Sequence, residues 1–183
     1  MKRGNKKEWV EKGYKMVSES SFTDVNIESI SRAVNKNKSS FYNYFGDWEG
    51  FEEELLNHHK LKAKQFGVDV KKCQNIIPET INLFIEYQID VFFHKNLRIN
   101  REKAHYQKCF ESVHAIFKEA ILDKWSTFIH LEGQYFLATK FLKLISENFL
   151  LQITDENYNY RWMENYFLEI SKLLFDLNPR VEK

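Results

Sequence analysis

Apolar residues recur at helical spacing along most of this chain, and few residues interrupt the pattern. Only 6 Gly and 2 Pro occur among 183 residues, whereas Leu, Phe, Lys and Glu are abundant. Apolar residues at positions i, i+3, i+4 and i+7 form one face of a helix, and no segment alternates as a half-buried strand does. The sequence therefore predicts an all-α fold.

Residues 8–19 predict the first helix, because Trp9, Tyr14 and Val17 fall on one apolar face. Gly13 lies in the middle of this helix, where glycine costs about 1 kcal/mol relative to alanine. A close helix–helix contact at Gly13 would explain its presence.

Two shorter helices follow. Asn26 is placed to cap a helix from Ile27 to about Val34, and Asn37 is placed to cap the next one, since asparagine accepts hydrogen bonds from helix N-termini. Asn35 between them tolerates the left-handed backbone of a tight turn. The side chains expected to lock the two helices together are Ile27, Ile30, Val34, Phe41 and Phe45.

The rest of the chain predicts longer helices. We expect one at residues 47–66 and another from Pro78 to about His94, since proline suits the first turn of a helix. We further expect one or two helices within residues 97–124, a connection at 125–130, and two strongly apolar helices at 132–153 and 158–177, with Pro179 ending the last.

Charge is distributed unevenly although the whole chain carries a formal net charge of only +1. Residues 1–45 carry a net charge of +4 and the remainder −3. This distribution suits an N-terminal segment, called the head below, that binds phosphate groups. Cys73 and Cys109 have no metal-ligand spacing and are interpreted as reduced thiols. The start MKRGNKKE is no signal peptide, and no apolar run reaches the roughly 18 residues of a membrane span. These features favour a cytoplasmic protein that does not enter a membrane.

The three N-terminal helices follow the plan of a helix-turn-helix, whose last helix lies in the DNA major groove. That helix must present small polar groups outward, because lysine, serine and asparagine reach phosphates or base edges. Its N-terminus also points backbone N–H groups at a phosphate. Tyr42 and Tyr44 have two interpretations, core packing or phosphate contact. The predicted DNA-binding residues are Asn26, Lys36, Asn37, Lys38, Ser39, Ser40, Tyr42, Asn43 and Tyr44.

The segment from Ile30 to Phe45 resembles the TetR family of bacterial transcriptional regulators, whose signature reads approximately I-A-x-x-A-G-V-S-x-G-x-L-Y-x-Y-F. The motif covers about a quarter of the chain, and the matching residues are Ile30, Phe41, Tyr42, Tyr44 and Phe45. The sequence departs from the pattern at Asn35, Lys36, Ser39 and Trp48, and Trp48 stands where the family usually has a phosphate-binding lysine. We therefore expect DNA contacts that differ from the family pattern at Lys36 and Trp48.

The resemblance implies a DNA-binding domain at residues 1–47 and a helical ligand-binding and dimerisation domain at 48–183. It implies a homodimer that binds double-stranded DNA at a palindromic operator. It also implies a ligand that shifts the population toward a state in which the two DNA-binding domains are wrongly spaced for the operator. Each of the two terminal helices carries more apolar surface than packing one face into a core would bury. This excess favours a homodimer through a four-helix bundle. Its members are Leu137, Phe141, Leu144, Ile145, Phe149, Leu151, Trp162, Phe167, Ile170, Leu174 and Phe175.

An effector pocket is expected among residues 76–125, because aromatic side chains with a few polar atoms suit a small, mostly apolar ligand. Simple core packing is the alternative for each of these side chains. The candidates are Tyr87, Phe92, His94, Tyr106, Phe110, His114 and Phe117.

An enzyme is the main rival class, but the chain has no catalytic or phosphate-loop motif, so we expect no catalytic residue, cofactor or metal. His58 and His59 are adjacent and point to different sides of a helix, and the run Glu52–Glu54 is interpreted as a solvated face. His94, His105 and His114 could meet in space. A second rival is a helical protein-interaction module that keeps the fold but has lost DNA binding.

Overall fold

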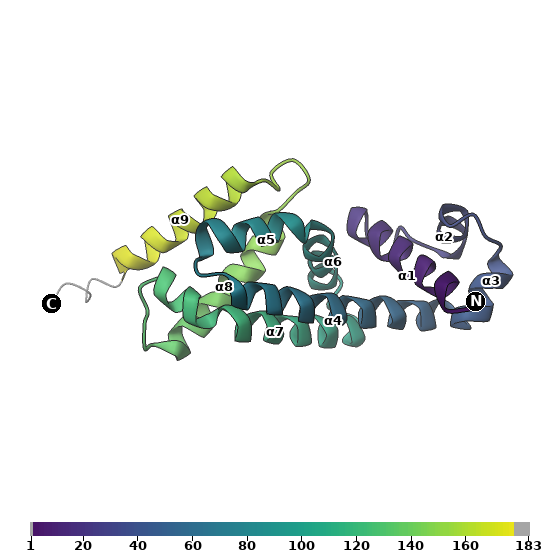
Figure 1. The fold of residues 1–183 in the computed structure, drawn as a ribbon, viewed down its shortest axis with the longest axis horizontal. Coiled ribbons are helices and arrows are strands. Elements are labelled where there is room, and N and C mark those ends of the chain that lie inside the picture. Colours follow the sequence, from purple (N-terminus) through teal and green to yellow (C-terminus); the bar gives the residue numbers. More distant parts are fainter. Residues whose placement is uncertain (1, 178–183) are drawn as a thin grey trace. The chain divides into compact units, whose positions relative to one another are not determined.

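The computed structural model describes residues 2–177, and the side chains of residues 6–176. All regular secondary structure within this range is helical, which confirms the all-α prediction (Figure 1). No helix in the described range is long and apolar enough to cross a membrane. The elements are α1 (Lys2–Glu19), α2 (Ile27–Ala33), α3 (Lys38–Phe45), α4 (Trp48–Lys72), a kinked turn (Ile76–Thr80), α5 (Ile81–Glu86), α6 (Gln88–Ile99), α7 (Ala104–Phe128), α8 (Tyr135–Gln152) and α9 (Tyr160–Leu177).

The helices pack as two compact units. Unit 1 comprises the chain up to residue 63 together with residues 89–113, and unit 2 comprises residues 64–88 and the chain from residue 114 onward. Helices α4 and α7 each contribute residues to both units. The predicted boundary after residue 47, between a DNA-binding domain and a ligand-binding domain, does not coincide with the division into these two units. It stays a prediction.

The core of unit 1 joins the three N-terminal helices to the start of α4. Trp9 and Phe41 are fully buried, and their ring centroids lie 5.6 Å apart in an edge-on arrangement that aromatic pairs favour. Phe51 packs against Phe41 at 5.2 Å. A Cβ added at Gly13 would overlap the Phe51 ring, so the close helix contact predicted at this glycine is confirmed.

Asparagine begins both short helices, as predicted. The Asn26 side-chain oxygen accepts hydrogen bonds from the backbone N–H groups of Glu28 and Ser29 at 3.0 and 2.9 Å. The Asn37 side chain accepts the Ser40 N–H at 2.9 Å. Asn35 adopts a positive φ of 53° between the helices. These contacts satisfy donors at the helix ends that would otherwise lack partners.

Glu52 is only 5% exposed, so its interpretation as part of a solvated face was wrong. Its carboxylate accepts hydrogen bonds from the Trp48 indole N–H at 3.0 Å and from the Tyr106 hydroxyl. Lys103 and His105 lie 3.9 and 3.5 Å from the same carboxylate. A buried carboxylate needs such partners, because an unpaired charge in the interior is strongly unfavourable.

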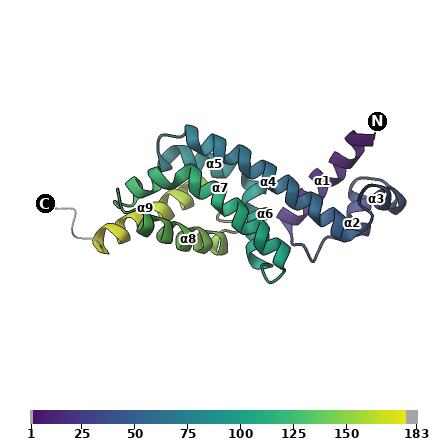
Figure 2. The same cartoon turned by 90° about the horizontal axis from the view of Figure 1, so that it is seen from below.

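Unit 2 is built around aromatic side chains from α5, α8 and α9. The course of these three helices can be followed in Figure 2. Phe149 contacts both Phe84 and Phe167, at centroid distances of 5.6 and 5.8 Å. The Trp125 indole N–H donates to the Ala138 carbonyl oxygen at 3.0 Å. Helix α7 includes Trp125 and continues to Phe128. The predicted connection at residues 125–130 was therefore wrong for residues 125–128.

The region around Pro78 also differs from the prediction of one helix ending near His94. A short kinked turn, in which Ile77 has extended backbone angles of −111° and 124°, precedes α5. Helix α5 ends at Glu86, and α6 then runs on to Ile99. Tyr87 separates the two helices with backbone angles of −92° and 26°. Its hydroxyl donates to the Asp69 carboxylate at 2.7 Å, a contact of distant residues that local periodicity does not reveal.

Candidate nucleic-acid interface

Helix α3 has one buried side and one polar exposed side. Phe41 is fully buried, whereas Lys38, Ser39, Tyr42 and Asn43 are exposed, with Tyr42 half exposed at 50%. These four positions follow the spacing i, i+1, i+4 and i+5, which places them on one face of a helix. The arrangement offers an ammonium, two hydroxyl groups and an amide on a single surface.

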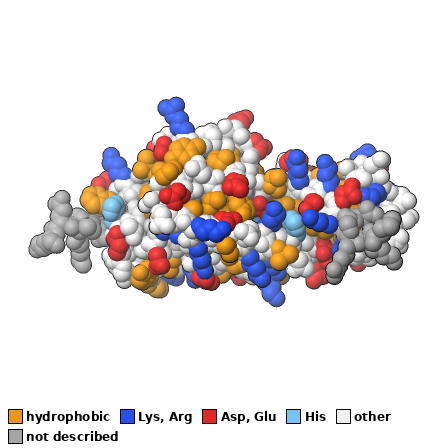
Figure 3. Space-filling model, viewed as in Figure 1, with side chains coloured by type: hydrophobic (Ala, Val, Ile, Leu, Met, Phe, Trp, Pro, Cys, Tyr) orange, Lys and Arg blue, Asp and Glu red, His pale blue; other side chains and the backbone are white. Residues whose placement is uncertain are grey.

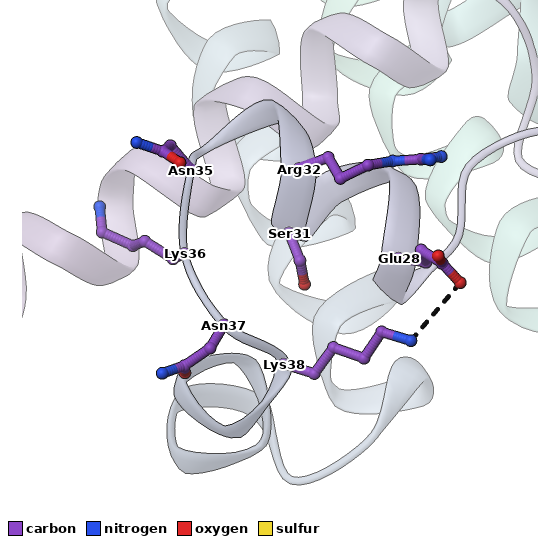
Figure 4. Close-up of a pocket in the computed structure, with 7 residues that line it drawn as sticks. All are labelled: Glu28, Ser31, Arg32, Asn35, Lys36, Asn37 and Lys38. Atoms are coloured by element: carbon purple, nitrogen blue, oxygen red, sulfur yellow. Dashed lines mark hydrogen bonds and ion pairs between the residues drawn. The ribbon is translucent and has the colours of Figure 1, made fainter.

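A pocket of about 450 Å³ opens beside the N-terminal end of α3 (Figure 4). It combines the side chains of Arg32, Lys36 and Lys38, which come from α2, the turn and α3, with one carboxylate, Glu28. Three cations against one anion give the pocket a positive character suited to phosphate. The lining residues are Glu28, Ser31, Arg32, Asn35, Lys36, Asn37 and Lys38.

The sequence-based site set contained only part of this lining, namely Lys36, Asn37 and Lys38. It omitted Arg32 and Glu28, which lie four residues apart and so share one face of α2. Placing α2 on a helical wheel would have shown this pair. The spacing alone does not show that the face borders the start of α3.

The two pocket lysines predicted to contact DNA form ion pairs within the protein. Lys36 pairs with Glu8 of α1, and Lys38 lies 3.4 Å from the Glu28 carboxylate, which Figure 4 marks with a dashed line. The Lys38 and Glu28 side chains are both more than half exposed. Exposed pairs of this kind contribute about 0–1 kcal/mol, so a phosphate could displace the carboxylate at little cost.

Two other predicted contact residues, Asn26 and Asn37, serve as helix caps, and a third, Ser40, is bonded to one of these caps. The side-chain oxygens of Asn26 and Asn37 accept backbone N–H groups, and the Ser40 hydroxyl donates to Asn37 at 2.8 Å. These bonds hold the amide and hydroxyl groups in fixed orientations at the starts of α2 and α3. Their contact with DNA stays a prediction.

The two tyrosines of α3 differ in exposure. Tyr42 is half exposed and touches Phe41 edge-on at 5.9 Å, whereas Tyr44 is less exposed and packs against Phe45 at 6.1 Å. Tyr42 is therefore the better placed of the two to reach a phosphate, and Tyr44 contributes more to packing.

The predicted effector-pocket residues are divided between the units. In unit 1, His94 stacks on Phe110 with centroids 4.5 Å apart. In unit 2, Tyr87 and Phe117 both pack against Phe66, at 5.0 and 6.0 Å. These contacts fit core packing, and the effector site stays a prediction. Unit 1 holds Phe92, His94, Tyr106 and Phe110, and unit 2 holds Tyr87, His114 and Phe117.

The three histidines considered as a possible metal group have separate surroundings. His94 contacts His59, and His105 lies beside the Glu52 carboxylate. His114 belongs to unit 2, where burial lowers the pKa of its ring below the ordinary 6.5 and nearby Lys143 acts in the same direction. Among the described residues, no group of three or more His, Cys, Asp or Glu side chains is placed to hold a metal ion.

Comparisons with known proteins give no relative from which a function could be transferred. No family model matches the chain, and neither does any curated protein or solved structure.

Proposed function

We propose that the chain is a TetR-like transcriptional regulator that binds double-stranded DNA through α3. The observation that carries the proposal is the exposed polar face of Lys38, Ser39, Tyr42 and Asn43 beside a pocket rich in cations. A helix with its side chains is about 10–12 Å across, so α3 can enter the major groove, which is roughly 12 Å wide. Asn43 is suited to adenine, and Lys38 to guanine or phosphate.

Phosphate contacts would fix the register of α3 on the duplex. Arg32 on α2 and Lys36 in the turn line the pocket together with the start of α3, where the helix dipole favours an anion. The Lys36 ammonium would have to leave Glu8 to reach a phosphate there. Contacts of this kind position a protein without reading sequence. We assign base reading to Asn43 and Ser39, and positioning to Arg32 and Lys36.

The terminal helices support a homodimer. Leu137, Leu144 and Leu151 recur every seven residues on α8, and Leu168 and Phe175 have the same separation on α9. All five side chains are exposed, and Figure 3 shows hydrophobic side chains on the surface along α9. A four-helix bundle formed with a second copy would bury them. The two heads would then read a palindromic operator.

The regulator would respond to a small, mostly apolar effector, and repression is the expected mode. An effector that binds better to a state unable to span the operator would release the DNA.

Titration of the protein into labelled DNA from upstream of its own gene tests the proposal. Affinity should fall steeply with added salt, because phosphate contacts release counterions. A Lys38→Ala, Asn43→Ala variant should lose roughly 100-fold in affinity, since one good base contact is worth about 1–3 kcal/mol. The matched control Lys64→Ala, Asn82→Ala removes the same groups from exposed positions of α4 and α5, outside both the head and the terminal helices, and should bind as the wild type does. Absence of salt-sensitive binding would reject the proposal.

A protein-interaction module without DNA binding is the second candidate. The ion pairs of Lys36 with Glu8 and of Lys38 with Glu28 favour it, because they neutralise two cations of the head. A protein that dimerises yet shows no affinity for any duplex at low salt would support this alternative.

A further inference from the structure

A chain of buried and half-buried polar groups connects three helices of unit 1. The Tyr14 hydroxyl of α1 lies 2.6 Å from His59 Nδ1 of α4 and 2.8 Å from the Asp90 carboxylate of α6. His59 Nε2 lies 3.1 Å from Nδ1 of His94, also on α6. His59 is only 2% exposed, and Tyr14 stacks on Phe93 at 4.1 Å. Three helices thus meet at one hydrogen-bonded cluster.

The hydrogens in this cluster have one consistent arrangement. As a carboxylate, Asp90 only accepts, so the single Tyr14 hydroxyl hydrogen points to Asp90. The Tyr14 oxygen must then accept from His59, which requires a hydrogen on His59 Nδ1. A neutral His59 carries no second hydrogen, so its Nε2 accepts from His94 Nδ1. Both rings are therefore assigned the Nδ1–H tautomer.

We infer that the chain His94–His59–Tyr14–Asp90 is a proton-ordered latch that holds α1 against α4 and α6, and that DNA affinity falls when a second proton enters the histidine pair. The inference rests on the proposed DNA-binding function. When the first additional proton binds to His94, the Nδ1–H of His94 still donates to His59 Nε2. A second proton on His59 makes both facing nitrogens donors, and it sets two positive charges 3.1 Å apart.

Loosening α1 would disturb the head because α1 carries part of its core. Trp9 of α1 packs on Phe41 and Phe45 of α3 at 5.6 and 6.4 Å. A second link ties α1 to α6, since the Asn96 amide donates to the Val17 carbonyl at 2.7 Å. Tyr14 of the latch and Trp9, which supports α3, therefore lie on the same helix only five residues apart.

The direction of the pH effect follows from burial. Burial lowers the pKa of His59 well below 6.5, and His94 and His58 act in the same direction. The unfolded chain then binds more protons, so this stabilisation is complete above about pH 6.5 and is lost as the pH falls. Burial raises the pKa of Asp90 above 3.8, which has the opposite sign and acts in a lower pH range. The other groups facing the cluster are Lys7 and Glu11 on α1, His58 and Lys62 on α4, and Cys109 on α7.

Imidazole ¹⁵N spectra of the DNA-free protein test the latch without reference to function. At pH 7.5, His59 and His94 should both give the pattern of the Nδ1–H tautomer. Tyr14→Phe removes the acceptor of His59 Nδ1–H while keeping the ring on Phe93, and this variant should lose the tautomer preference of His59. An Nε2–H tautomer of His59 in the wild type would overturn the inference.

DNA affinity measured from pH 7.5 to 5.5 tests the regulatory part. We expect wild-type affinity to fall by up to about tenfold, because each pH unit below 6.5 favours a loosened state, in which His59 is protonated, by at most the equivalent of one pKa unit. General protonation of histidines adds positive charge and would strengthen DNA binding, so a decrease is diagnostic. Tyr14→Phe should bind more weakly at pH 7.5 and vary little with pH, whereas the control Tyr135→Phe, an exposed tyrosine of α8, should follow the wild type.

The outcomes separate the two proposals. The expected tautomers together with DNA affinity that is independent of pH would overturn the regulation. Absence of DNA binding at every pH would reject the proposed function, and the spectra would still decide whether the latch exists. If Tyr14→Phe does not fold, His94→Phe takes its place, because its ring can keep the stack on Phe110.

Discussion

The outward face of α3 and the outward faces of α8 and α9 are similarly exposed but opposite in chemistry. Tyr42 on α3 is 50% exposed and Leu144 on α8 is 63% exposed. Around Tyr42 stand lysine, serine and asparagine side chains, whereas leucines recur around Leu144. Beneath both surfaces lie aromatic cores. The cores therefore hold each unit together, whereas the exposed side chains are the ground for the two proposed partners, DNA for α3 and a second copy for α8 and α9.

Leu144→Glu is expected to have the largest effect of the substitutions that test these two surfaces. A dimer would bury this position in both copies, where an unpaired carboxylate is unfavourable, so we expect dimer affinity to fall by about 2–4 kcal/mol. Analytical ultracentrifugation across a concentration series measures the change. Leu61→Glu is the matched control, because this α4 leucine is 65% exposed and lies outside α8 and α9. Equal behaviour of the two variants would remove the case for the dimer surface.

Gly13→Ala tests whether the polar face of α3 depends on close packing beneath it. The added methyl group overlaps the Phe51 ring, and overpacking of this kind costs about 1–3 kcal/mol. Improved helix propensity offsets about 1 kcal/mol of this loss. We expect a net loss of about 0–2 kcal/mol in the free energy of unfolding, measured by urea denaturation. Phe51→Leu in the same chain should be less harmful than in the wild type, because it makes room for the methyl group.

Glu28→Gln should produce the smallest change, an increase in DNA affinity. The substitution removes the charge that holds Lys38 and leaves the lysine to the phosphate backbone. Because exposed pairs contribute about 0–1 kcal/mol, affinity should rise by up to about fivefold. Glu49→Gln, an exposed acidic residue in the first turn of α4, gives the comparison for a general change of net charge. Weaker binding by Glu28→Gln would contradict the role given to Lys38.

Local features of the N-terminal helices were predictable from the sequence. The Asn26 and Asn37 caps, the left-handed Asn35 and the tight contact at Gly13 each follow from what one residue type does at one backbone position. The same holds for the buried positions of Phe41 and Ile30, which helical periodicity places inside.

Contacts between distant residues were not predictable. Glu52 stands in a run of three glutamates, and its burial depends on Tyr106, 54 residues away. His59 looked like one of two adjacent histidines, and its partners Tyr14 and His94 come from other helices. Periodicity specifies which side of a helix turns inward. It does not specify which polar groups meet there.

The two helix caps have an electrostatic consequence of their own. Aspartate caps a helix as well as asparagine does, and its negative charge interacts favourably with the helix N-terminus. At Asn26 and Asn37 the chain carries the uncharged amide in both places, although aspartate would stabilise the isolated helices more. A carboxylate at position 37 would lie in the cationic pocket and repel any phosphate entering it. The neutral caps thus give up some folding stability and keep the potential around α3 attractive to an anionic polymer.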